Sequence, residues 1–166
     1  MAGGTQWVYG QSAGQADRMT IDWRRAVIAG IAGTVVFDLI GLVLTGRWSV
    51  PMLLGAKLGI GLAGGAVAHY VNGVLLAIIY AGIAPSLWGP DWARALTFMS
   101  AQTLFGVWLF MNPLLDMGIA GLKAGPMAPL VSLISHWAFG LTVSFLYPVA
   151  KAGTSSRPSP GMARLR

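Results

Sequence analysis

The chain has 166 residues, of which 55% are apolar and only 10% are charged. A soluble domain carries about 25% charged residues, and sixteen charged side chains are too few to cover the surface of a water-soluble globule of this size. The composition therefore excludes soluble, disordered and fibrous proteins and indicates an integral membrane protein. The sequence has no cysteine, which excludes disulfides, thiolate metal sites, iron–sulfur clusters and cysteine nucleophiles.

Four apolar windows follow one another along the chain, and each is long enough to cross a bilayer as a helix of about 20 residues. They cover residues 26–44, 61–83, 95–115 and 128–150. Residues 48–60 are also apolar but are interrupted by Pro51, Gly55 and Lys57, which indicates an interfacial segment and not a fifth span. We therefore predict an all-α fold, an integral membrane four-helix bundle made of two tandem helical hairpins.

Four segments are expected: a polar N-terminal arm (1–24), a first hairpin (25–84), a second hairpin (85–150) and a basic flexible tail (151–166). If the four windows span the membrane, eight of the eleven Lys and Arg residues lie on one side, and only Arg47, Lys57 and Lys123 lie on the other. The positive-inside rule then predicts that the arm and the tail are both cytoplasmic. This topology also accounts for the net charge of +6, so no nucleic-acid partner is expected.

An internal repeat links the two halves of the chain. The pattern Gly55-x-Lys57, His69-x-x-x-Gly73, Tyr80 recurs as Gly121-x-Lys123, His136-x-x-x-Gly140, Tyr147. Two copies in the same orientation predict hairpins related by a pseudo-two-fold axis along the membrane normal.

Small residues at helical spacing indicate which helix faces are buried. The helix-packing candidates are Gly61, Gly65 and Gly73 in the second window and Gly140 in the fourth. Small residues let helix backbones approach closely, and such contacts drive helix association in lipid. The two histidines are therefore expected to face the inside of the bundle.

A buried polar layer is expected near the middle of the bundle. Asp38, His69 and His136 each lie about eight residues, or roughly 12 Å, from the non-cytoplasmic end of a span. Ionisable groups at such depth suggest function and need a partner, and we expect Asp38 to pair with His69. The predicted layer consists of Asp38, His69, Asn72, Gln102 and His136.

Several interpretations of this layer remain open. The first is a set of hydrogen bonds that fixes helix register, with no cofactor. The others are a b-type haem ligated by His69 and His136, a divalent metal held by both histidines and Asp38, and a proton or small-solute path. The path would run through Asp38, His69, Asn72 and Gln102. Paired carboxylates, phosphate loops and serine–histidine arrangements in loops are missing from the sequence, so no catalytic residues and no enzymatic activity are expected.

Three short motifs carry a resemblance to a known group of proteins: Ala29-Gly30-x-x-Gly33-Thr34, the two His-x-x-x-Gly segments that end in tyrosine, and Gly89-Pro90-Asp91-Trp92-x-Arg94-Ala95. Over residues 25–150 the chain resembles small four-helix inner-membrane proteins of unknown function, the YagU-like and related uncharacterised families. The resemblance implies a multi-pass protein of a bacterial or archaeal cytoplasmic membrane, and it implies no activity.

From its size and composition we expect a non-catalytic accessory or structural subunit. Its partners would be the lipid bilayer and other integral membrane subunits of a larger complex, with a respiratory or photosynthetic complex as the candidate setting. The alternatives are a haem- or metal-binding membrane protein using His69 and His136, and a small oligomeric transporter.

Overall fold

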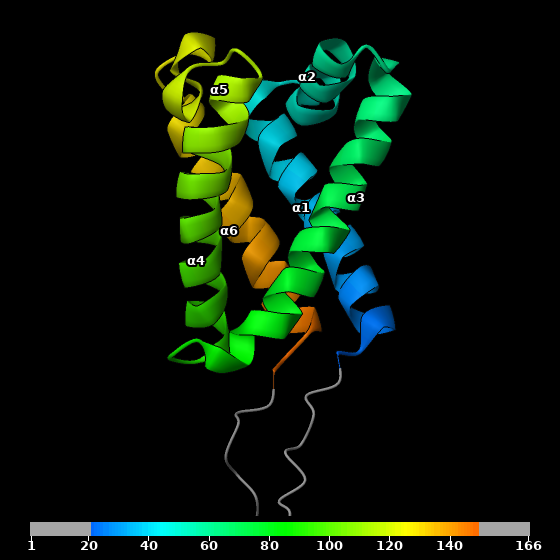
Figure 1. Cartoon of the computed structure of the whole chain (residues 1–166), viewed down its shortest axis with the longest axis vertical. Coiled ribbons are helices and arrows are strands. Elements are labelled where there is room, and N and C mark those ends of the chain that lie inside the picture. Colours follow the sequence, from blue (N-terminus) through cyan, green and yellow to red (C-terminus); the bar gives the residue numbers. More distant parts are fainter. Residues whose placement is uncertain (1–20, 150–166) are drawn as a thin grey trace, which may run out of the picture.

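The computed structural model describes residues 21–149, and within this range the chain is helical without any β-strand. The predicted tail lies outside the described residues, as does the predicted arm except for its last four residues. The elements (Figure 1) are, in chain order, α1 (Trp23–Thr45), α2 (Ser49–Leu58), α3 (Gly61–Ile83), η1 (Ala84–Ser86), α4 (Asp91–Ala101), η2 (Gln102–Met111), α5 (Asn112–Leu114), η3 (Ile119–Ala124) and α6 (Ala128–Leu146).

Three helical segments in the described part of the chain are long and apolar enough to cross a membrane: Trp23–Thr45, Gly61–Ser86 and Ala128–Leu146. The predicted all-α class and membrane character are confirmed at this level. The second window, 61–83, coincides with α3, whereas the fourth ends four residues early because α6 stops at Leu146. The third window is divided among α4, the π-helix η2 and the short α5, which follow one another without a gap from Asp91 to Leu114.

The ends of α1 and α2 are set by local hydrogen bonds and by glycine. The Asp22 carboxylate accepts a hydrogen bond from the backbone N–H of Arg25 at 3.0 Å and caps α1. Gly59 and Gly61 both have φ of +69°, a conformation that favours glycine, so the chain reverses sharply between α2 and α3. The segment predicted to be interfacial is therefore a separate helix, and α2 packs against α3.

The long helices form an open array. Helix α1 packs against α3 and α6, and α6 packs in turn against α4. Helices α3 and α4 meet near η1 and then diverge, as Figure 1 shows. The contacts between α3 and α4 are therefore fewer than those between α1 and α6.

Close backbone contacts hold the array together. A Cβ atom on Gly30 would lie 2.7 Å from Val74 Cα, and a Cβ on Gly65 would clash with the backbone of Pro51 and Gly55. A Cβ on Gly73 would overlap Thr34 Oγ1. The predicted packing glycines Gly65 and Gly73 thus lie where neighbouring helices leave no room for a side chain.

Gly140 and Gly61 complete the predicted set of packing glycines. A Cβ on Gly140 would lie 2.5 Å from Met99 Cγ and 3.3 Å from the Ala95 carbonyl oxygen, so Gly140 lets α6 approach α4. Gly61 differs, because a Cβ there would meet open space. Its positive φ shows that it is needed for the turn into α3.

The two repeated tyrosines occupy matching places. Tyr80, near the end of α3, donates its hydroxyl to the Asp91 carbonyl at the start of α4 (3.2 Å). Tyr147, which follows α6, accepts from the Asp22 N–H at the start of α1 (3.2 Å). Both contacts fall on a second repeated motif, because the Asp-Trp-x-Arg-Ala pattern at 91–95 also occurs at 22–26.

Both repeated lysines affect the charge of Asp116. The Lys123 ammonium group hydrogen-bonds the Asp116 carboxylate in the loop before η3, at 2.5 Å. This bond, the charge of Lys123 and the charge of Lys57 together hold the pKa of Asp116 below its usual value.

We expect Gly73→Ala to lower the stability of the protein by about 1–3 kcal/mol, because the added methyl group forces α1 away from α3. The measurement is thermal unfolding in detergent micelles. Gly41→Ala is the matched control, since a Cβ on Gly41 meets nothing within 4 Å, and it should be neutral or slightly stabilising. Adding Thr34→Ala should recover part of the loss. An unchanged melting temperature for Gly73→Ala would contradict this close approach.

Candidate functional site

Asp38 and His69 form the central pair of the site. Thr34 of α1 lies against Gly73 of α3. Because the helices are antiparallel, Asp38, one turn after Thr34, meets His69, one turn before Gly73. The Asp38 Oδ1 atom lies 3.0 Å from His69 Nε2, and the two side chains are only 12% and 9% exposed. The structure thus brings together the two residues expected to pair.

His136 approaches the same region from α6. Its Nδ1 lies 2.7 Å from the carbonyl oxygen of Ser132, one turn earlier in the same helix. The Phe37 ring makes edge contacts with both imidazoles, with centroid separations of 5.2 Å to His69 and 4.9 Å to His136. Phe37 therefore fixes the position of the two histidines relative to α1.

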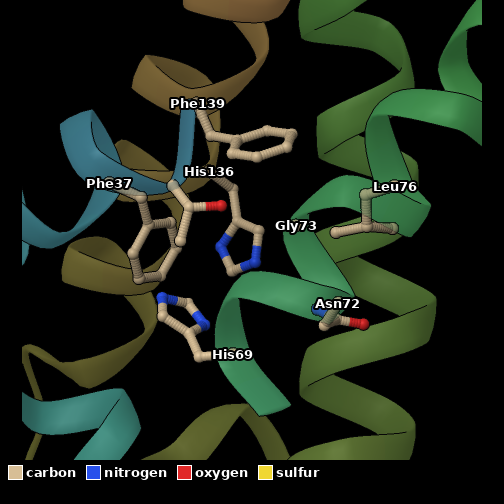
Figure 2. A pocket seen from close by; sticks show the side chains of 8 residues that line it. Phe37, His69, Asn72, Gly73, Leu76, His136 and Phe139 are labelled. Carbon is tan, nitrogen blue, oxygen red and sulfur yellow. The ribbon is translucent and has the colours of Figure 1, made fainter. Parts of the chain in front are cut away.

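A small cavity of about 20 Å³ lies among these side chains (Figure 2). A volume of this size holds about one water molecule. Its lining comes from α1, α3 and α6 and consists of Thr34, Phe37, His69, Asn72, Gly73, Leu76, His136 and Phe139. Asn72 is exposed, so the cavity reaches the surface on its side of α3.

Gln102 is separate from the other predicted polar residues. It lies in η2, is absent from the cavity lining, and its Oε1 is buried without a hydrogen-bond partner in the described residues. Three hydroxyls outside the predicted layer are also buried without a hydrogen-bond partner in the described residues. They belong to Thr103 in η2 and to Ser132 and Ser135 in α6. The predicted five-residue layer is thus divided, with Asp38, His69, Asn72 and His136 near the cavity and Gln102 elsewhere.

The geometry bears on the ligands considered for the histidines. A cavity of about 20 Å³ is far too small for a haem, so a haem would require Phe37 and Phe139 to move away. Asp38 contacts His69 through Nε2. Residues 21–149 contain no group of three or more His, Asp or Glu side chains that could hold a metal ion. The arrangement therefore does not provide a direct three-residue metal site, and its polar groups do not continue to Gln102 as a path.

Comparisons of the chain with protein-family models, curated proteins and solved structures give no match. The interpretation of the site therefore depends on its own residues.

A double-mutant cycle on Asp38→Ala and His69→Ala should give a coupling energy of about 0.6 kcal/mol, with an upper range near 1.7 kcal/mol, as for other hydrogen bonds between membrane helices. The free energy of unfolding would be measured by denaturant titration in mixed micelles. The control cycle combines Asp38→Ala with Thr142→Ala, whose hydroxyl bonds the Ala138 carbonyl within α6, and should be additive. Equal coupling in both cycles would argue against a specific pair.

Proposed function

We propose that the chain is a four-span membrane protein built from two tandem hairpins, with the segment 91–114 as the additional span. The continuous run of α4, η2 and α5 supports this proposal, because 24 helical residues cover about 36 Å. The matching contacts of Tyr80 and Tyr147 support duplication. The same proposal includes membership of the YagU-like and related families, which the chain resembles over residues 25–150.

The function that we propose is that of a non-catalytic accessory subunit of a larger integral membrane complex, with respiratory and photosynthetic complexes as the candidate settings. The observation that carries this proposal is the divergence of α3 and α4 beyond η1. In two equivalent hairpins the interface between α1 and α6 has a counterpart between α4 and α3, and these two helices diverge instead of packing. We infer that a transmembrane helix of another subunit completes this interface.

Exposed apolar side chains on α3 are consistent with such a contact. Asn72 lies at the mouth of the cavity, and Ile79, two turns further along the helix, is 50% exposed. Val67 is 64% exposed and points about 140° away from Asn72 around the helix axis. Asn72 and Ile79 therefore lie on the face of α3 that carries the mouth of the cavity, while Val67 belongs to another face of α3.

We expect a photoreactive amino acid at position 72 or 79 to cross-link to one and the same integral membrane protein in native membranes. The matched control is the same amino acid at position 67, which should label lipid. Cross-linked products would be separated by electrophoresis and identified by mass spectrometry. Products with lipid alone at all three positions would contradict the subunit proposal. Cross-links to a second copy of the chain would favour the oligomeric alternative, a small transporter.

We further propose a bacterial or archaeal inner-membrane location with both termini cytoplasmic, supported by the distribution of basic residues. The chain contains no cysteine, so single cysteines report topology directly. Trp88→Cys should be protected in intact cells from a membrane-impermeant maleimide, and Leu122→Cys should react, since both side chains are exposed (96% and 57%). Labelling both variants in broken cells is the control. The reverse pattern would invert the proposed orientation.

A further inference from the structure

The hydrogen bonds of the two imidazoles determine where their lone pairs lie. Asp38 offers a carboxylate and Ser132 offers a carbonyl, and both are acceptors, so His69 Nε2 and His136 Nδ1 carry the protons of these bonds. In a neutral imidazole the second nitrogen is then an acceptor. His69 Nδ1 and His136 Nε2 thus present lone pairs, and within residues 21–149 neither has a hydrogen-bond partner.

This arrangement is the one found around metal-ligating histidines. Such histidines almost always donate their other N–H group to a carboxylate or to a backbone carbonyl, which fixes the tautomer and the orientation of the ring. His69 donates to the carboxylate of Asp38, and His136 donates to the backbone carbonyl of Ser132. Both rings line the same cavity (Figure 2), and imidazole nitrogen is a good ligand for copper and zinc.

The charge of the site selects among these ions. Asp38 has no ion-pair partner other than His69 in the described residues, and its Oδ2 is buried without a partner. The two arginines of α1 lie in its first turn, and α3 and α6 contain neither Lys nor Arg. One negative charge in an apolar layer is neutralised by one positive charge, and a divalent ion would leave a net charge of +1.

We propose that His69 Nδ1 and His136 Nε2 form a two-coordinate binding site for Cu(I), with the Asp38 carboxylate balancing the charge of the ion. Cu(I) is a monovalent d¹⁰ ion that accepts two nitrogen ligands, so it needs no third protein ligand. Asp38 contributes as a positioning residue through His69. This site adds to the subunit role proposed above and does not depend on it.

The test uses the full chain, purified in detergent without metal and titrated anaerobically with Cu(I) against a chromogenic Cu(I) chelator. We expect one Cu(I) per chain. His69→Gln and His136→Gln should each abolish binding, and Asp38→Asn should weaken it about 10- to 100-fold, as for other losses of a group that supports a metal ligand. Thr142→Ala is the matched control, because Thr142 lies outside the cavity lining and its hydroxyl bonds only the Ala138 carbonyl within α6, and its affinity should be unchanged.

A second measurement uses the unsubstituted protein, so it does not depend on whether a variant folds. X-ray absorption at the copper edge should report two nitrogen neighbours, whereas sulfur neighbours would place copper on some of the eight methionines and overturn the proposal. It would also be overturned if the chain competed for no Cu(I), which is the result for a cavity that holds only water. Unchanged binding in both histidine variants, or tighter binding of Zn(II) under the same conditions, would exclude it as well.

Discussion

The close approach of α1 and α3 determines the geometry of the site. In lipid no hydrophobic force draws two apolar helices together, so packing depends on how near the backbones come. Gly30 and Gly73 allow the approach, and Thr34 lies against Gly73. The register that results places Asp38 opposite His69 at hydrogen-bonding distance. A bulkier residue at either glycine would separate the two polar groups as well as the helices.

A second close approach, between α6 and α4, follows the same antiparallel spacing with different chemistry. Gly140 lies against Met99, as Gly73 lies against Thr34. One turn after Met99, where α1 carries Asp38 one turn after Thr34, lies Thr103, whose hydroxyl is buried without a partner in the described residues. His136 consequently has no carboxylate across the interface and bonds a carbonyl of its own helix. Two histidines that are equivalent in the sequence repeat thus have different electrostatic surroundings.

Much of this fold follows from hydropathy and helix-breaking residues. The bounds of α3 were predicted from hydropathy. Pro51, Gly55 and Lys57 indicated that residues 48–60 are not a further span, whereas the helical conformation of α2 was not predicted. The proximity of Asp38 and His69 followed from counting their depth along antiparallel spans. Depth does not specify the direction around a helix. Gln102 therefore does not line the cavity, although its position along the chain suggested the same layer. The divergence of α3 and α4 could not be predicted, because both faces of a membrane helix are apolar whether they meet protein or lipid.

The hydrogen bond between Asp22 and Tyr147 joins the two ends of the described chain. Arg25 Nε also donates to the Leu146 carbonyl at 3.0 Å, so α1 begins where α6 ends. The corresponding junction between α3 and α4 is covalent and runs through η1, where Tyr80 bonds Asp91. A circular permutant that opens the chain in the exposed loop near Trp88 and joins the present ends would exchange the covalent and the hydrogen-bonded junction. If the site forms in that permutant, the order of the helices along the chain is separable from the contacts that build the site.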